Sequence, residues 1–304
     1  MYTQEQLRII EKVEHLIAAE GSQSKACQKL GISQGVISPI RKGTYTGNVD
    51  MVFEKLREYF DVKMLNQATL CEVEYVDTFI SHEVYEVIRI CQVKGGLAIA
   101  CGDAGIGKTK AARKFISDNP NSSIMITINP CFTSVKAILE LVAERIGAAP
   151  ESSRDKMWLS IAGKLRDGMV LIFDEAQHLT NKSIEVLRSF SDHFADRGQT
   201  LGIVFIGNIN TVGRMGSKKA EFAQIVNRTK QTKTYSVSQI GREDIQKLFP
   251  LIADKKNEID FLWRISQTRQ ALRGAVNLFS NAYDNDNYTY QGLVAMAKYM
   301  DMNW

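Results

Sequence analysis

The sequence lacks long apolar runs and any close pair of cysteines. No stretch of roughly 18–20 apolar residues is present that could cross a membrane, and the start, MYTQEQLRIIEKVEH, has no apolar core of a signal peptide. We therefore expect no membrane partner and a cytoplasmic location. The five cysteines are scattered, odd in number and never spaced as CxxC, which argues against a disulfide framework or a zinc site and indicates reduced, mostly packed thiols.

The length and the composition are those of an ordinary globular protein. Its 304 residues allow two or three domains, at roughly 100–200 residues per domain. Hydrophobic residues make up 44% and charged residues 24%, so a sizeable core can form without metals or disulfides. The net charge of +4 permits binding to a polyanion but does not require it.

The first 66 residues predict a small helical domain. Apolar residues from Leu7 to Ile17 recur at helical spacing. A short helix over about 23–30 follows, then a turn at Gly31 with Ser33 as the N-cap of a second short helix that ends near Arg41. One more helix is expected over about 52–59. Residues 67–77 show no periodicity and are interpreted as a linker.

The segment 25–38 has the pattern of a helix-turn-helix. Ala26 is small where two helices would cross, Gly31 permits the turn, and Ile32 and Ile37 are apolar plugs. Pro39 is expected to shorten or bend the second helix. The candidate DNA contacts on this helix and just after it are Ser33, Gln34, Ser38, Arg41 and Lys42. Because glutamates offset the lysines here, a protein-docking bundle is the alternative.

The middle segment, 78–237, alternates apolar runs with helical patterns. The runs lie at 97–101, 124–128, 170–173 and 203–206, with a weaker polar run at 232–237. Such alternation predicts an α/β domain with a largely parallel sheet covered by helices. Residues 238–304 show helical periodicity only and predict a C-terminal helical domain of four helices, the last over 290–299.

A phosphate-binding loop follows the first apolar run. Residues 102–109 read GDAGIGKT, which matches GxxxxGK(S/T) between a strand and a helix. Glycines let the backbone N–H groups face the phosphates, and the helix adds its positive N-terminal end. Lys108 would reach the β- and γ-phosphates and Thr109 the Mg²⁺ of ATP. The candidate nucleotide-binding residues are Gly102, Asp103, Ala104, Gly105, Ile106, Gly107, Lys108, Thr109 and Lys110.

Polar residues end two further strands of the predicted sheet. Asp174 and Glu175 follow the run 170–173, at the edge where ligands lie in open α/β sheets. Asp174 would hold Mg²⁺, directly or through water, and Glu175 would act as general base on the attacking water. Asn208 follows the run 201–206 and would orient that water or touch the γ-phosphate. The alternative for Asn208 is a turn beside Gly207.

These features in this order, with a helical C-terminal domain, resemble the AAA+ ATPases over residues 78–304. The resemblance implies that an arginine from a neighbouring subunit completes the site. Arg228 lies in the usual place for it, and Arg214 is a rival. Arg273 matches the arginine with which the helical lid contacts the phosphates.

The whole chain is similar to the family of the phage Mu B transposition protein and related transposon ATPases. The similarity rests on the helix-turn-helix, AAR at 111–113 after the phosphate loop, DEA at 174–176 followed by His178-Leu179, a strand ending in GN, and ALR at 271–273. It implies an ATPase that binds duplex DNA non-specifically and assembles on it as a filament. It also implies delivery of that DNA to a transposase, whose activity it stimulates, in the host cytoplasm if a phage encodes it.

The family also implies DNA contacts from the ATPase domain. The candidates are Arg113, Lys114, Arg214, Lys218 and Lys219, and each can equally be a solvated surface charge. Two other interpretations stay open: a helicase-loading or replication-initiation ATPase, and a secretion or signalling ATPase whose N-terminal bundle binds protein. A simple repressor is disfavoured, because the sequence carries a full set of hydrolytic residues.

Overall fold

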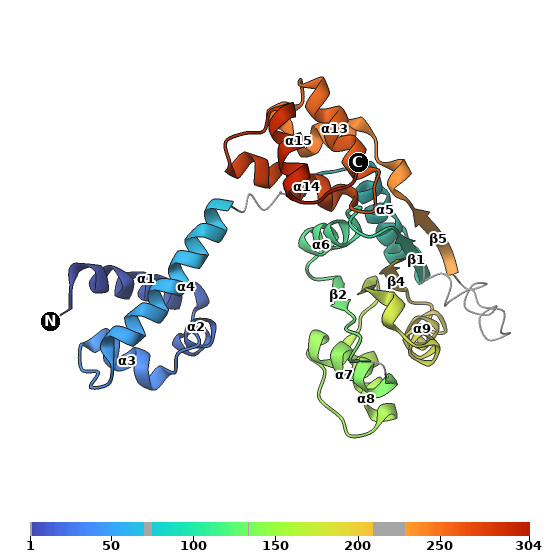
Figure 1. The fold of residues 1–304 in the computed structure, drawn as a ribbon. Helices are drawn as coiled ribbons and strands as arrows, with labels where there is room; N and C mark the ends of the chain where they lie inside the picture. Colours follow the sequence, from blue (N-terminus) through green and yellow to red (C-terminus); the bar gives the residue numbers. More distant parts are fainter. Residues whose placement is uncertain (1, 70–74, 133, 209–228) are drawn as a thin grey trace. The chain divides into compact units, whose positions relative to one another are not determined.

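The computed structural model describes residues 2–69, 75–132, 134–208 and 229–304, with the backbone alone over 62–69 (Figure 1). These residues form two compact units, Met1–Glu72 and Val73–Trp304. The predicted fold class is confirmed: a parallel sheet between helices, a helical C-terminal part and a helical N-terminal part. No helix in the described residues is long and apolar enough to span a membrane.

The N-terminal unit has four helices, and sharp glycine turns separate the first three. Gly21, Gly31 and Gly43 each adopt a left-handed conformation and end a helix, with φ between 63° and 69°. A side chain there would be strained, because L residues rarely adopt positive φ. The helices are α1 (Gln4–Glu20), α2 (Gln23–Leu30), α3 (Gln34–Lys42) and α4 (Val49–Thr69).

The core of this unit forms where the first three helices meet α4. Ala26 and Ile37 are fully buried, as expected for a helix crossing and an apolar plug, and they pack with Leu56. Pro39 does not end α3, which continues to Lys42. The expectation for α4 was too short. The helix reaches into the predicted linker as far as Thr69, because no glycine or proline interrupts residues 49–69.

The larger unit is built on five parallel strands in the order β2-β3-β4-β1-β5. The strands are β1 (Gly96–Gly102), β2 (Ser123–Thr127), β3 (Met169–Asp174), β4 (Leu201–Gly207) and β5 (Thr229–Tyr235). The polar strand β5 was expected at 232–237. It begins and ends earlier because its residues from Thr229 to Tyr235 pair with β1.

Side chains alternate between the two faces of the sheet, and each face is covered. Ile99 and Cys101 of β1 face the core shared with α7 (Val135–Ile146), α8 (Arg154–Lys164) and α9 (Asn181–Ala195). Ala98 and Ala100 face the core shared with α5 (Phe79–Lys94), α6 (Lys108–Asp118) and the C-terminal helices. Burial on both faces explains why the central strands are continuous apolar runs.

The C-terminal part continues from β5 as helices only. They are η2 (Val237–Gln239), α12 (Arg242–Leu248), η3 (Pro250–Ile252), α13 (Lys256–Ser266), α14 (Ala271–Asp284) and α15 (Tyr290–Tyr299), where η marks a 3₁₀ helix; η1 (Ala176–His178) follows β3. Residues of α13, α14 and α15, such as Leu262, Leu278 and Leu293, share one core with α5 and α6. In Figure 1 these helices lie together, next to α5 and α6. The lid and the sheet therefore belong to one unit, which carries the candidate site.

Candidate functional site

The carboxyl ends of β1, β3 and β4 meet at one edge of the sheet. Cys101 of β1 is in register with Gly207 of β4, and Phe173 of β3 is in register with Phe205 of β4. Gly102, Asp174 and Asn208, which come next along these strands, therefore emerge at the same edge. The strand β4 lies between β1, which carries the phosphate loop, and β3, which carries the two acidic residues.

The backbone of the loop 102–109 requires glycine. Gly102 has a φ of 149°, and a Cβ there would lie 1.9 Å from the carbonyl oxygen of Tyr235. Gly105 and Gly107 have φ of 77° and 101°, and Gly107 is the N-cap of α6. Positive φ at these positions turns the chain back on itself directly before the helix. The N-terminal end of α6 is thus open to an anion.

Asp103 ties the loop to the end of β5. Its N–H donates to the Tyr235 carbonyl oxygen (3.1 Å), and its Oδ2 accepts from the N–H of Val237 (2.9 Å). Sequence reasoning placed Asp103 among the nucleotide-binding residues only through its position in the motif. The structure adds a carboxylate that fixes the loop to the start of the lid.

Lys108 occupies the centre of the loop. Its Nζ donates to the carbonyl oxygens of Gly102 (3.0 Å) and Asp103 (2.5 Å), and only 9% of the residue is exposed. Burial lowers the pKa of Lys108, and the charges nearby, with Asp174 first, oppose that shift. Within the part of the chain that the structure describes, this buried ammonium donates to two neutral carbonyl oxygens, which makes it a strong partner for an incoming phosphate.

Thr109 and Asp174 meet across the gap between β1 and β3. The Thr109 hydroxyl donates to Asp174 Oδ2 at 2.9 Å, and Asp174 is only 3% exposed. Burial raises the pKa of Asp174, while the hydrogen bonds from Thr109 and from the Glu175 N–H lower it. A hydroxyl and a carboxylate side by side are hard oxygen ligands of the kind Mg²⁺ takes alongside phosphates and water.

Glu175 stands exposed on the same edge in a left-handed conformation, with φ of 55°. Its N–H donates to Asp174 Oδ1 (3.0 Å), and its Oε2 accepts from the side-chain amide of Gln177. Gln177 in turn accepts from the backbone N–H of Asn208 (3.2 Å) through its Oε1. Sequence reasoning missed Gln177, although its position two residues after the acidic pair was visible.

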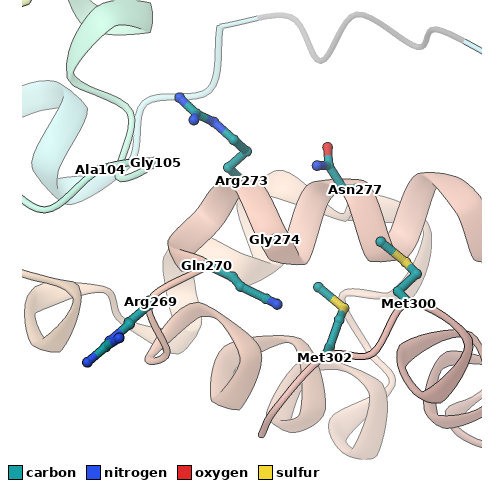
Figure 2. A pocket seen from close by; sticks show the side chains of 9 residues that line it. All are labelled: Ala104, Gly105, Arg269, Gln270, Arg273, Gly274, Asn277, Met300 and Met302. Atoms are coloured by element: carbon teal, nitrogen blue, oxygen red, sulfur yellow. The ribbon is translucent and has the colours of Figure 1, made fainter.

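The lid contacts the phosphate loop through α14. The N–H of Arg273 donates to the Gly105 carbonyl oxygen (3.1 Å), and a Cβ on Gly105 would lie 3.1 Å from that of Arg273. A cavity of about 280 Å³ lies here, lined by both P-loop and lid residues. Figure 2 shows the exposed Arg273 side chain extending from α14 on the side of Ala104 and Gly105.

Some of the residues proposed to contact DNA from the N-terminal unit are exposed, whereas others are hydrogen-bonded within the unit. Ser33, Gln34 and Lys42 are exposed. Ser38 accepts from Gln23 Nε2 at 2.7 Å. Arg41 is bound within the unit: its Nε and Nη2 donate to Glu14 at 2.5 and 2.7 Å, and its Nη1 donates to Gln23 Oε1 at 2.7 Å.

The candidates on the larger unit also differ from one another. On α6, Arg113 and Lys110 are exposed, while Lys114 pairs with Asp118 at 2.7 Å. The remaining predicted arginines and lysines fall outside the described residues: Arg214, Lys218, Lys219 and Arg228. Their DNA-binding and arginine-finger roles stay predictions.

Comparisons with known proteins agree with this geometry. Residues 92–215 match the family model of an AAA domain. In fold, the chain is similar to the ORC2 protein of Aeropyrum pernix in its ADP form, with a TM-score of 0.55 at 11% identity over 71% of this chain and 67% of that one. It is also similar to CDC6P of Pyrobaculum aerophilum, with a TM-score of 0.56 at 14% identity over 74% and 68%. Identities this low establish the fold and nothing about replication.

Curated relatives match most of the chain. The Mu-like prophage FluMu DNA transposition protein B of Haemophilus influenzae is 28% identical, over 77% of this chain and 80% of that protein. The ATP-dependent target DNA activator B of Escherichia phage D108 is 31% identical and that of Escherichia phage Mu 30%, each over 80% of this chain and 77% of the relative. With its AAA domain and its phosphate loop, the chain is an ATPase, and it belongs to the family of the ATP-dependent target DNA activator B proteins.

Proposed function

We propose that this ATPase binds duplex DNA when loaded with ATP, delivers that DNA as a target to a transposase, and stimulates transposition. The observation that carries the proposal is the gathering of Lys108, Thr109, Asp174 and Glu175 at one sheet edge in a chain that is 30–31% identical to target DNA activators. Membership of that family favours target delivery over helicase loading and over secretion or signalling.

In this proposal each residue of the site has one task. Lys108 and the N–H groups of residues 102–109 bind the β- and γ-phosphates. Thr109 and Asp174 would hold Mg²⁺, which their 2.9 Å contact supports, and the bound ion would supply neutralisation of the phosphate charge. Glu175 accepts the proton of the attacking water. Asn208 orients that water at the end of β4.

Arginines couple the state of the nucleotide to assembly. Arg273 would contact the γ-phosphate; its place in the first turn of α14 beside Gly105 supports this role. Arg228, supplied by a neighbouring subunit, would complete the site and make ATP a signal for self-assembly into filaments on DNA. Arg214 is the alternative finger.

DNA binding is shared between subunits. The net charge of one chain is only +4, so the overall attraction of a single subunit to DNA is modest. The exposed Ser33, Gln34 and Lys42 of the N-terminal unit, and Arg113 of α6, supply them here. Many subunits on one duplex multiply these contacts, which gives tight but sequence-independent binding.

Electron microscopy of the protein with duplex DNA and either ATP, a slowly hydrolysed analogue or ADP tests assembly. Filaments are expected with ATP and the analogue and are expected to be absent with ADP. Monomers in all three conditions would refute self-assembly. Addition of the cognate transposase should then direct strand transfer to the coated DNA; unchanged strand transfer would refute target delivery.

Glu175→Gln tests the hydrolytic assignment. The amide cannot take a proton from water, so turnover should fall by about 100-fold or more, while ATP binding stays intact and the DNA-bound state lasts longer. The matched control is Glu144→Gln on the exposed surface of α7, which should leave turnover unchanged. Equal turnover of Glu175→Gln and the wild type would remove Glu175 from this role.

A further inference from the structure

A buried amide connects the proposed general base to the end of β4. Gln177 is 8% exposed and lies in the 3₁₀ turn η1 that follows β3. Its Nε2 donates to Glu175 Oε2, and its Oε1 accepts from the backbone N–H of Asn208 at 3.2 Å. The same Nε2 lies 3.4 Å from His178 Nε2. Both ends of one carboxamide are therefore in use.

The orientation of this amide follows from its partners. The N–H of Asn208 can only donate, so the carbonyl oxygen of Gln177 must face it. The NH₂ group must then face Glu175, whose ionised carboxylate can only accept. Reversal of the amide would lose both hydrogen bonds at once and would leave a buried polar group unpaired, which is costly. The Gln177 amide therefore has one stable orientation.

We propose that Gln177 is a positioning residue for hydrolysis: it anchors one oxygen of Glu175 and so directs the other oxygen at the attacking water. This inference rests on the proposed role of Glu175. The backbone of Glu175 is already constrained to φ of 55°, and Asp174 accepts from its N–H. The exposed side chain would still rotate in solvent, and Gln177 removes that freedom.

The same contact makes the base sensitive to the end of β4. The position of the Gln177 amide is set by the backbone of Asn208, the residue next to Gly207 in the strand between β1 and β3. A shift of that backbone on ATP binding would be transmitted through one side chain to Glu175. In this proposal the main chain of Asn208 would position Gln177, in addition to the role proposed for its side chain.

Gln177→Met tests the proposal, because methionine has a similar volume but no hydrogen-bonding amide. In the full chain, kcat should fall by about 10- to 100-fold, the range found when a supporting hydrogen bond or an exact placement is lost. KM and the Kd for ATP should change by less than about threefold, because Gln177 does not contact the phosphate loop. An unchanged or increased kcat would overturn the proposal.

A double-mutant cycle separates positioning from general damage. If Gln177 acts only through Glu175, then Gln177→Met should lower turnover no further once Glu175→Gln is present. Losses that multiply in the double variant would show an independent role and overturn the proposal. If Glu175→Gln alone leaves turnover unchanged, the proposed function fails at the general base, which is a different result from failure at Gln177.

Two further variants control for folding. Gln92→Met removes a half-buried glutamine, which donates to the carbonyl oxygen of Gly168 (3.0 Å) and to the Ser122 hydroxyl (3.0 Å), away from the site; kcat should stay unchanged. Gln177→Asn keeps the amide but shortens it by one methylene, so it cannot reach both partners. A reduced kcat in a chain that melts like the wild type supports positioning, and a full wild-type kcat contradicts it.

Discussion

The nucleotide site and the helix-turn-helix surface were inferred from equally short motifs, yet their residues are arranged differently. At the sheet edge, Thr109 and Glu175 both donate hydrogen bonds to Asp174, although Thr109 is far from Asp174 in sequence. On the N-terminal unit, Arg41 turns inward to Glu14 and Gln23, while Gln34 and Lys42 stay exposed. A site for a compact ligand must converge, whereas a surface for a long polyanion need only remain charged.

The comparison also shows where rigidity lies. The phosphate loop is held by hydrogen bonds within the protein: the Asp103 N–H donates to the Tyr235 carbonyl oxygen, and the Asp103 carboxylate accepts from the Val237 N–H. Of the DNA candidates, Lys42 and Arg113 are exposed side chains, whereas Arg41 and Lys114 are held by ion pairs at the surface. Substitutions should therefore have large, local effects at the loop and small, distributed effects on the N-terminal unit.

The strongest test of loop rigidity is Gly102→Ala. Its Cβ would lie 1.9 Å from the Tyr235 carbonyl oxygen, a backbone atom that cannot move aside cheaply. Overpacking of this kind costs about 3 kcal/mol, or about 6–12 °C in Tm for a unit of this size. Nucleotide binding should be lost as the loop shifts. Thermal melting and titration with ATP measure both.

The control for Gly102→Ala is Gly163→Ala. Gly163 lies in α8 with nothing within 4 Å of a Cβ, and its φ is not positive. Alanine there should stabilise the helix by about 0.5–1 kcal/mol and leave ATP binding unchanged. If Gly102→Ala melts and binds ATP like the wild type, the loop is adaptable and the contrast between the two regions disappears.

Asp174→Asn separates the stability of the site from its function. The folded-state pKa of Asp174 is raised by burial, so the folded state holds the proton more tightly than the unfolded state. The Asp174 carboxyl group therefore contributes most to stability below its ordinary pKa of 3.8. This contribution is lost as the pH rises through the pKa of Asp174 in the folded state. Near pH 7 the buried carboxylate is a cost that asparagine removes.

Without ligand, the Asp174→Asn variant is expected to have a higher Tm than the wild type. It is also expected to be stabilised less by ATP with Mg²⁺. An asparagine oxygen can still accept from the Glu175 N–H, and its NH₂ can donate to Thr109. Tm should rise by about 2–4 °C, which corresponds to about 1 kcal/mol, and the gain should shrink as the pH is lowered toward 4. Stabilisation by ATP with Mg²⁺ should be lost. The exposed Asp196→Asn should change neither quantity, and a lower Tm for Asp174→Asn would show that its hydrogen bonds outweigh its burial.

Features that depend on neighbouring residues were predictable from the sequence. The bounds of α2 and α15 follow from their caps and their periodicity. The meeting of Thr109 with Asp174 follows from parallel strands whose carboxyl ends share one edge. Each of these needs only local chemistry or a general rule of α/β topology.

Features that depend on packing were not predictable. Gln177 reaches both Glu175 and Asn208 because a 3₁₀ turn follows β3 and because β4 is its neighbour in the sheet. The linker was expected from residue 67, yet α4 continues to Thr69, since the absence of a periodic pattern does not stop a helix that meets no glycine or proline. The inward turn of Arg41 required knowing that α1 places Glu14 beside α3.

The smallest effect is expected on the N-terminal unit, where substitutions of Lys42 and Arg41 should have different consequences. Lys42→Ala removes an exposed charge, so the slope of log K against log salt for DNA binding should fall by about 0.9, with similar loss on any sequence. Arg41→Ala should leave that slope unchanged. It should instead lower the free energy of unfolding of the N-terminal unit by about 0.5–1 kcal/mol, because the half-exposed ion pair with Glu14 is lost.

Binding isotherms at several salt concentrations, and hydrogen exchange of α1 and α3 in the full chain, measure the two quantities separately. A slope reduced equally by both variants would mean that Arg41 leaves Glu14 for a phosphate. The surface would then rearrange on binding, and the contrast with the fixed phosphate loop would be greater than the structure alone indicates. If neither variant changes the slope, the N-terminal unit does not contact DNA through these residues. That result would favour a protein-docking bundle over a DNA-binding helix-turn-helix.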